Sequence, residues 1–397
     1  MKWFQNANYP RWAVVNFIIL SCWGVALRYL QLYNLPLNYL FILHAHSHFA
    51  FSGWMFFSIA LLIAPLCSGE QLSLGFKYVL IIALVSAYGM LLSFSWQGYR
   101  SVSIGCSTLF VWVTFRFTYL VFKSNLLKNR VNSTAYELIR GSLVLLCLSA
   151  LGPFTLGPLA ALGLKNTPYY QDAVYFYLHF QMNGFMLLAA LGLLASTLPV
   201  LSFQGKTSRW LKLFIFSTIP LYFIFTLWAK PGSGLWVLAS LGAGLNLLSW
   251  LFLCFAFSRT CGDLLSLEKA ALVALTLKVI FQVLICIGPI GDWVFLSRNL
   301  VIGYIHLLTL GSVMPLLLSQ FIKKGLIKPV ISTGLFSGVY IVLTVTYLCL
   351  LFIQPLLALF SVTIPAFQFL LLILCLLFLL SGILLLGTVK NSKIGRM

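Results

Sequence analysis

The sequence predicts an all-α, polytopic membrane protein, and its composition and its pattern of apolar runs predict it. Of the 397 residues, 61% are hydrophobic and only 8% are charged, whereas soluble domains carry roughly a quarter charged residues. A disordered chain is excluded as well, because disorder requires a polar sequence that is poor in aromatic residues. Twelve apolar runs have about the 20 residues that a helix needs to cross the hydrocarbon core. Only short segments separate them, so we expect one integral membrane domain over residues 1–397.

Each apolar run is expected to be a helix, because backbone groups in lipid must form their hydrogen bonds within their own segment. The twelve expected spans cover residues 12–30, 38–66, 77–95, 104–122, 140–163, 172–199, 211–229, 234–257, 269–290, 298–321, 330–353 and 363–388.

The basic residues predict the direction of these spans. The net charge of +19 comes from 25 Lys and Arg against 6 Asp and Glu, a balance that in a soluble domain would suggest nucleic acid. Here most basic residues lie between the apolar runs, so no nucleic-acid partner is expected. With a cytoplasmic N-terminus, 18 of the 25 fall on the cytoplasmic side and only five outside: Arg28, Arg100, Lys165, Lys230 and Arg298. The positive-inside rule therefore predicts that both termini are cytoplasmic.

All five histidines fall in the second, sixth and tenth spans. Span two reads LHAHSHFAFSGW, span six YFYLHFQMNGF and span ten NLVIGYIHLLTLGS, which contain His44, His46, His48, His179 and His306. The last histidine of each span is followed five positions later by a glycine: Gly53, Gly184 and Gly311. Because four spans separate successive histidines, we expect three pseudo-repeated four-helix units, at about 12–122, 140–257 and 269–388.

The expected depth of these histidines suggests a shared site. Spans two, six and ten would all run inward, with their histidines at similar depth in the outer half of the membrane. Imidazole is costly in lipid and is the commonest side-chain metal ligand. Within span two, His44 and His48 share a helical face, while His46 points about 200° away from His44. A plainer alternative is that His179 and His306 form interhelical hydrogen bonds and that the glycines permit close helix packing.

Twelve helices with histidines on the second, sixth and tenth resemble subunit I of the haem–copper oxidases. The segments HAHSHFAFSGW and HLLTLGS also resemble the smaller membrane haem–copper proteins of the nitric-oxide-response (NnrS) type. This resemblance implies a b-type haem held by a span-two histidine, His48 in the first instance, and by His306, with His179 where the oxidases place a copper ligand. It also implies a bacterial cytoplasmic membrane, redox chemistry or handling of NO or O2, and a redox partner or oxidase subunits.

Several departures from the oxidase pattern are visible. Span seven, WLKLFIFSTIPLYFIFTLW, has no histidine, and Tyr304 stands where the oxidases carry a second histidine on span ten. The loop FIQPLLALFSVTIPAF lacks the arginine pair that holds haem propionates, and no Asp or Glu lies mid-membrane. A complete oxygen-reducing, proton-pumping oxidase is therefore not expected, and whether the chain is an enzyme stays open.

Further candidate residues surround the histidines. Arg28 and Arg298 suit propionates through their bidentate guanidinium groups, although both also suit interfacial anchoring. Copper could bind to His44, His46 or His48, Tyr304 could bond a ligand, and Gly53 and Gly311 could lie beside a cofactor. Asn183 and Gln181 could orient imidazoles. Lys278 lies deep in span nine without an acidic partner in the spans.

Two other functions remain open at the sequence level. A twelve-span secondary transporter could use the outer histidines for metal- or proton-coupled solute binding, although such folds usually show two six-helix halves. An assembly factor that carries haem or copper to an oxidase is the other. The nine cysteines include no C-x-x-C pair, which argues against a zinc site and covalent haem attachment.

Overall fold

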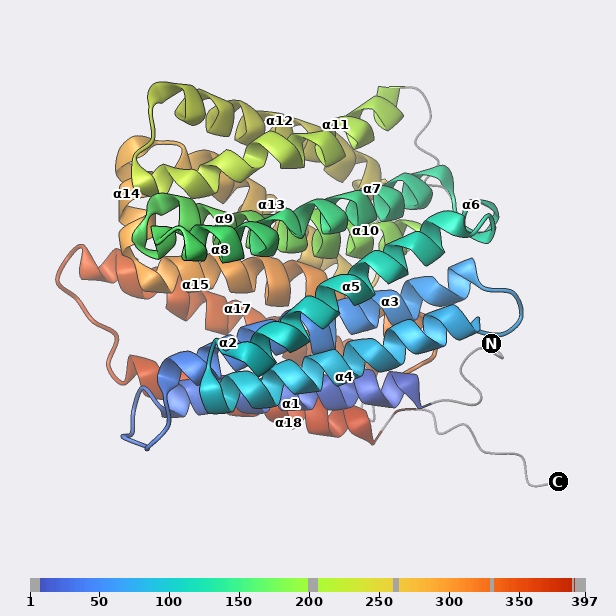
Figure 1. Cartoon of the computed structure of the whole chain (residues 1–397), viewed down its shortest axis with the longest axis horizontal. Coiled ribbons are helices and arrows are strands. Elements are labelled where there is room, and N and C mark those ends of the chain that lie inside the picture. Colours follow the sequence, from blue (N-terminus) through green and yellow to red (C-terminus); the bar gives the residue numbers. More distant parts are fainter. Residues whose placement is uncertain (1–7, 199–205, 260–263, 329–331, 388, 390–397) are drawn as a thin grey trace. The chain divides into compact units, whose positions relative to one another are not determined.

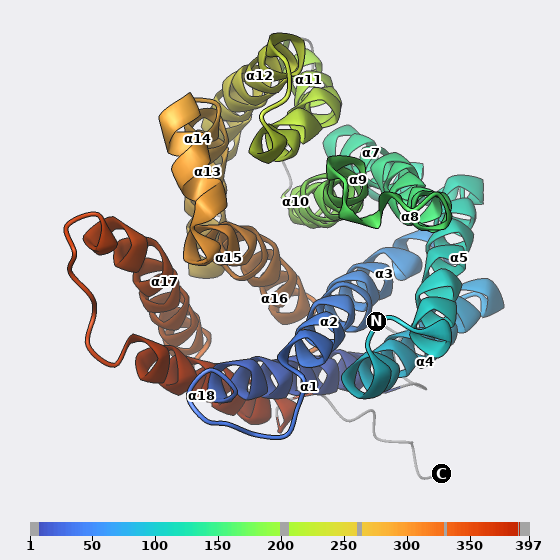
Figure 2. The same cartoon turned by 60° about the vertical axis from the view of Figure 1, so that its left-hand side comes forward.

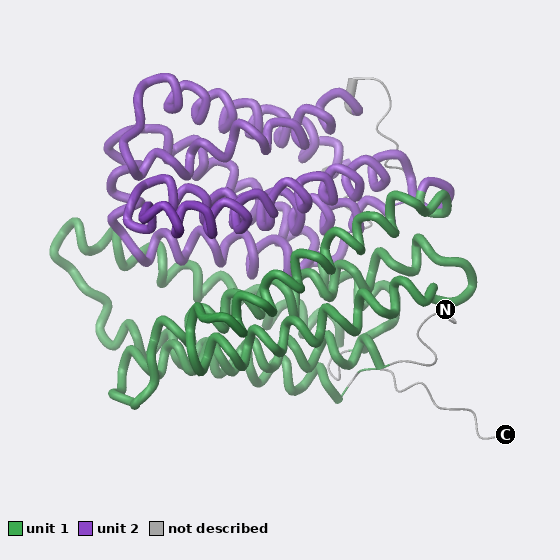
Figure 3. Tube along the Cα trace, in the orientation of Figure 1, with its two compact units in different colours: residues 1–127, 317–397 green, residues 128–316 purple. Residues whose placement is uncertain are grey.

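The computed structural model describes residues 8–198, 206–259, 264–328, 332–387 and 389. Every regular element in these ranges is a helix, which confirms the predicted all-α class (Figure 1). The chain separates into two units, of which unit 1 comprises residues 1–127 and 317–397 and unit 2 comprises residues 128–316 (Figure 3). Each unit is described by itself.

Unit 1 contains the N-terminal helices and the last two. Its elements are α1 (Tyr9–Tyr29), α2 (Tyr39–Phe49), η2 (Ala50–Phe56), α3 (Phe57–Ile63), η3 (Ala64–Cys67), α4 (Leu74–Gln97), α5 (Ser101–Lys123), α17 (Thr333–Ala358) and α18 (Phe367–Leu386). Helix α1 packs against α18 and α2, and α4 packs against α2 and α5. The short helix α6 (Leu126–Arg130) and the longer α16 (Met314–Lys323) cross from one unit to the other.

Unit 2 contains the middle of the chain. Its elements are α7 (Ser133–Ser149), α8 (Leu151–Ala161), η4 (Leu164–Asn166), α9 (Pro168–His179), η5 (Phe180–Met186), α10 (Leu187–Ala195), α11 (Lys206–Leu221), η6 (Tyr222–Ala229), α12 (Ser233–Ser258), α13 (Ser266–Ile285), α14 (Gly288–Leu296), α15 (Arg298–His306) and η8 (Leu307–Val313). Helices α11, α12 and α13 follow one another side by side, and α7 packs against η5 and α10 (Figure 2).

Eleven helices in the described part of the chain are long and apolar enough to cross a membrane, or twelve if one bent pair forms a span. These segments match the predicted apolar runs, so the polytopic membrane class is supported. The bent pair is α13 and α14, and the chain bends by 111° between them. The sequence predicted a single span there, over residues 269–290. Pro289 supplies the physical reason, because a proline lacks the N–H and disfavours helical geometry in the residue before it.

A short π-helix follows a histidine in each of the three histidine-bearing spans. The segments η2, η5 and η8 have seven residues each and begin one or two positions after His48, His179 and His306. A π-helix is rare and occurs frequently at functional sites. Where the α-helix resumes, one backbone carbonyl loses its regular amide partner. The three glycines that follow the histidines all lie inside these segments.

Candidate functional site

His44 and His48 face the same side of α2, toward the end of α4. The His48 ring stacks on Phe94 at a centroid distance of 4.3 Å and an interplanar angle of 11°. His48 Nε2 lies 2.7 Å from the Tyr99 hydroxyl oxygen, in hydrogen-bonding contact. The His44 ring meets the Tyr99 ring edge-on at 4.7 Å. Aromatic side chains therefore surround both imidazoles, and the His48 Nε2 atom is occupied by its hydrogen bond with Tyr99.

His46 faces the opposite side of α2, as helical geometry requires. Its Cε1 atom lies 3.5 Å from the position that a Cβ atom on Gly24 of α1 would occupy. The three span-two imidazoles therefore do not converge on one metal ion. Among the residues that the structure describes, no group of three or more His, Cys, Asp or Glu side chains could hold a metal.

A buried arginine lies one helical turn beyond Gly24 on α1. Only 6% of Arg28 is exposed, and its Nη2 donates to the Tyr347 hydroxyl at 2.6 Å. Its Nη1 donates to Gln31 Oε1 at 3.2 Å. The one acidic residue of unit 1 is Glu70, which follows span two whereas Arg28 precedes it, so the two belong to opposite ends of that span. Among the described residues of unit 1, the guanidinium therefore has neutral partners and no carboxylate.

Arg28 is linked to the helix that carries His46 through Gln31. Gln31 Nε2 donates to the Tyr39 hydroxyl at 3.2 Å, which connects the end of α1 to the first residue of α2. Tyr39 precedes His46 by seven residues, two helical turns, so the two lie on one face of α2. His46 thus lies against α1 at Gly24, and Arg28 lies one turn further along α1, where its guanidinium bonds Tyr347 of α17.

His179 in unit 2 is enclosed by hydrogen bonds. Its Nε2 lies 2.7 Å from the carbonyl oxygen of Thr218 and therefore donates to it. Its Nδ1 then accepts from Asn183 Nδ2 at 3.3 Å. Thr218 lies just before the junction of α11 with the 3₁₀ helix η6, where the change in hydrogen-bond register leaves one carbonyl without a helical amide. Both ring nitrogens are occupied, so a metal at His179 would have to displace one of these bonds.

Asn183 also joins a buried amide and phenol network. Gln282 Nε2 donates to the Tyr304 hydroxyl at 2.7 Å and to Asn183 Oδ1 at 3.4 Å. Tyr304 in turn donates to Asn183 Oδ1 at 3.5 Å. Gln181, expected to orient an imidazole, instead donates to Ser149 Oγ. Gln282 was not among the predicted site residues. In the sequence, only its position one helical turn after Lys278 indicates a role.

His306 and Arg298 both lie on α15. His306 Nδ1 lies 2.8 Å from the carbonyl oxygen of Ile302, one turn earlier, and donates to it. In a neutral imidazole this makes Nε2 the nitrogen that carries the lone pair. Arg298 is exposed at the start of the helix, eight residues or about 12 Å before His306.

Gly53 is explained by packing within unit 1. A Cβ atom there would lie 2.7 Å from the Phe49 ring, and its carbonyl oxygen accepts a hydrogen bond from Asn16 Nδ2. Asn16 Oδ1 accepts from the Tyr88 hydroxyl at 2.8 Å. The asparagine therefore pairs a carbonyl of the π-helix η2. Gly311 occupies the corresponding place in η8.

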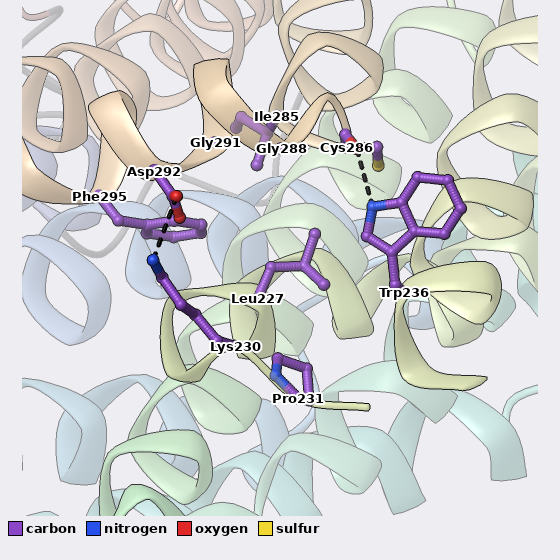
Figure 4. Close-up of a pocket in the computed structure, with 10 residues that line it drawn as sticks. All are labelled: Leu227, Lys230, Pro231, Trp236, Ile285, Cys286, Gly288, Gly291, Asp292 and Phe295. Atoms are coloured by element: carbon purple, nitrogen blue, oxygen red, sulfur yellow. Dashed lines mark hydrogen bonds and ion pairs between the residues drawn. The ribbon is translucent and has the colours of Figure 1, made fainter. Parts of the chain in front are cut away.

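The break between α13 and α14 borders a pocket of about 230 Å3 (Figure 4). Trp236 Nε1 donates to the carbonyl oxygen of Cys286 at 2.9 Å, which pairs a backbone group that the broken helix leaves exposed. Lys230 and Asp292 form an ion pair of 3.2 Å across the pocket. Both are half-exposed or more, so this pair contributes little to stability.

Comparison with known proteins gives no relatives, since neither a family model nor a curated protein matches the sequence. Function is therefore inferred from the residues of the chain itself.

Proposed function

We propose that this chain is a membrane protein that binds a b-type haem and acts in redox chemistry or in the handling of a diatomic gas such as NO or O2. The observation that carries the proposal is that His46 lies against Gly24 of α1, one helical turn before the buried Arg28. An imidazole suits the iron and a guanidinium without a carboxylate suits a propionate. This choice replaces His48 with His46 as the span-two ligand, because His48 Nε2 already contacts Tyr99.

The family resemblance also implies that His306, in unit 2, would hold the iron. The His306 Nδ1–H donates to the Ile302 carbonyl, the usual support for a metal-binding histidine, since it fixes the ring and leaves Nε2 basic. When bound, haem supplies a one-electron couple and an iron site for a gas, tuned by axial ligands and burial. In unit 1, the chain's own part would be to present an imidazole nitrogen to the iron, to neutralise a propionate with Arg28 and to exclude water.

Copper does not fit the described residues. His44 and His48 face Tyr99 while His46 faces α1, and both nitrogens of His179 are engaged. We therefore assign no role to copper. The haem proposal carries with it a bacterial cytoplasmic membrane, cytoplasmic termini and a redox partner.

A secondary transporter is the second candidate, favoured by the 111° break between α13 and α14. Discontinuous helices build the substrate sites of many transporters. The two candidates differ in a direct way: a transporter would move solute in reconstituted vesicles that contain no haem.

The test is a reduced-minus-oxidised visible spectrum of the full-length protein, purified in detergent from haem-replete cells, with iron measured on the same sample. We expect a b-type spectrum and about one iron per chain. A featureless spectrum from folded protein would refute the haem proposal and favour the transporter.

A further inference from the structure

Lys278 is a buried cation near the middle of α13. Only 1% of its surface is exposed, although an ammonium group in a membrane protein requires compensation. Among the described residues, its Nζ forms no hydrogen bond and no ion pair. His179 is an ionisable neighbour within electrostatic range, and its two ring nitrogens are already bonded.

The acidic residues of unit 2 are engaged elsewhere. Glu268 bonds the backbone N–H of Leu265 at the start of its own helix, ten residues or about 15 Å from Lys278. The other three described acids pair with Lys212, Trp228 and Lys230: Glu137, Asp172 and Asp292. Asp263 lies outside the described residues and precedes α13, whose first residue is twelve positions, about 18 Å, from Lys278. No carboxylate in the described part of unit 2 therefore balances this charge.

A buried neutral amide, Gln282, follows Lys278 on α13. Gln282 is one turn further along α13, on the same face, and is fully buried. Its Oε1 has no hydrogen-bond partner. The amide can also be placed with O and N exchanged, which keeps a bond to Tyr304 and gives up the two long bonds to Asn183 Oδ1, at 3.4 and 3.5 Å. In that orientation Tyr304 would donate to Gln282 Oε1. A Gln282 N–H would then occupy the position where Oε1 now has no hydrogen-bond partner. Lys278 Nζ and Gln282 Nε2 would then form a pair of donors on one face.

We propose that unit 2 binds a small inorganic monoanion at Lys278, with the Gln282 amide as a second donor. The anion supplies the negative charge that the described residues do not, and neutral hydrogen bonds from Gln282 complete its surroundings. This inference does not rest on haem, since all of its residues lie in unit 2 and none is a proposed iron ligand.

The test is thermal unfolding of the full-length protein in detergent, with chloride, nitrite, nitrate or hydrogencarbonate titrated against gluconate at constant ionic strength. A ligand that binds only the folded state raises the unfolding temperature saturably. We expect such a rise for at least one of these anions. Lys278→Met should weaken the apparent affinity at least tenfold. Lys165→Met, which removes the same charge from an exposed position of unit 2, should leave the affinity unchanged.

Two results would overturn the proposal. One is a wild-type protein whose unfolding temperature shows no saturable rise with any of the four anions. An uncharged Lys278 amine would behave in this way. The other is a Lys278→Met variant that responds as the wild type does. If that variant does not fold, Gln282→Leu keeps the charge and removes the amide, and it should also weaken the affinity at least tenfold. Haem content measured on each sample separates this outcome from failure of the haem proposal.

Discussion

The histidine-bearing spans of unit 1 and unit 2 share a backbone design and differ in what their histidines contact. In both, a π-helix begins one or two residues after a histidine and includes the following glycine. His179 is bonded at both nitrogens by Thr218 and Asn183. His46 instead faces the backbone of α1 near a buried arginine. The first arrangement is a hydrogen-bonded network of side chains within unit 2, whereas the second combines an imidazole and a buried guanidinium, the two group types that suit a haem.

The largest expected effect comes from breaking the unit 2 network. Asn183→Leu would remove the bond that His179 Nδ1 accepts and the acceptor that Gln282 and Tyr304 share, whereas the His179–Thr218 and Gln282–Tyr304 bonds would remain. Each unsatisfied group costs about 1–3 kcal/mol, so we expect the free energy of unfolding to fall by about 2–4 kcal/mol. Chemical denaturation of haem-free protein measures this. The His46→Ala variant, measured haem-free in the same way, should lose about 1 kcal/mol or less of its free energy of unfolding. An equal loss in Asn183→Leu and His46→Ala would remove the contrast between the surroundings of His179 and His46.

The next effect concerns Arg28. Arg28→Met removes the guanidinium proposed for a propionate, an interaction of about 1.5–3 kcal/mol for a charge-assisted hydrogen bond. We expect haem to bind roughly 10- to 150-fold more weakly, measured by transfer of haem to an apoprotein acceptor. Arg100→Met is the matched control, because that arginine is an exposed residue of unit 1. Equal loss in both variants would show that Arg28 acts only through general charge.

A smaller effect distinguishes two of the three π-helix glycines, Gly184 and Gly53. A Cβ on Gly184 would lie 2.8 Å from Leu145 Cβ, which is fixed to its backbone. A Cβ on Gly53 would instead meet the ring of Phe49, which can rotate. Overpacking costs about 1–3 kcal/mol, so Gly184→Ala should destabilise by about 2 kcal/mol and Gly53→Ala by about 1. Thermal unfolding tests the order, and the reverse order would contradict this account of the packing.

The smallest effect is expected at the hydroxyl that holds Asn16. Tyr88→Phe removes the bond to Asn16 Oδ1 but leaves the asparagine bonded to the Gly53 carbonyl. A single hydrogen bond contributes about 1 kcal/mol. Asn16→Leu removes both bonds and should cost about twice as much by the same denaturation measurement. A Tyr88→Phe cost above that of Asn16→Leu would contradict the proposed support of η2.

The sequence predicts the spans well, because hydropathy over about 20 residues reports directly on what can lie in lipid. It predicts the opposite faces of His46 and His48 from helical periodicity, but not which face meets α1, since that depends on packing between helices. The π-helices after the histidines carry no compositional signal. Asn183 could be predicted to orient His179, because it lies four residues later on the same helical face; its bonds to Gln282 and Tyr304 arise from tertiary contact, which the sequence does not indicate. The α13–α14 break could be read from Gly288-Pro289, which the uniform hydropathy of 269–290 conceals.

The most direct test of the central claim is the haem content of His46→Ala against His48→Ala, by pyridine haemochrome and iron analysis on full-length protein from the same expression. The two residues share one helix and lie two positions apart, so each is a matched control for the other. We predict that His46→Ala and His306→Ala lose haem at least tenfold, while His48→Ala keeps nearly all of it. Retention of haem by His46→Ala with loss from His48→Ala would contradict the assignment of the α1–α2 contact as the haem site.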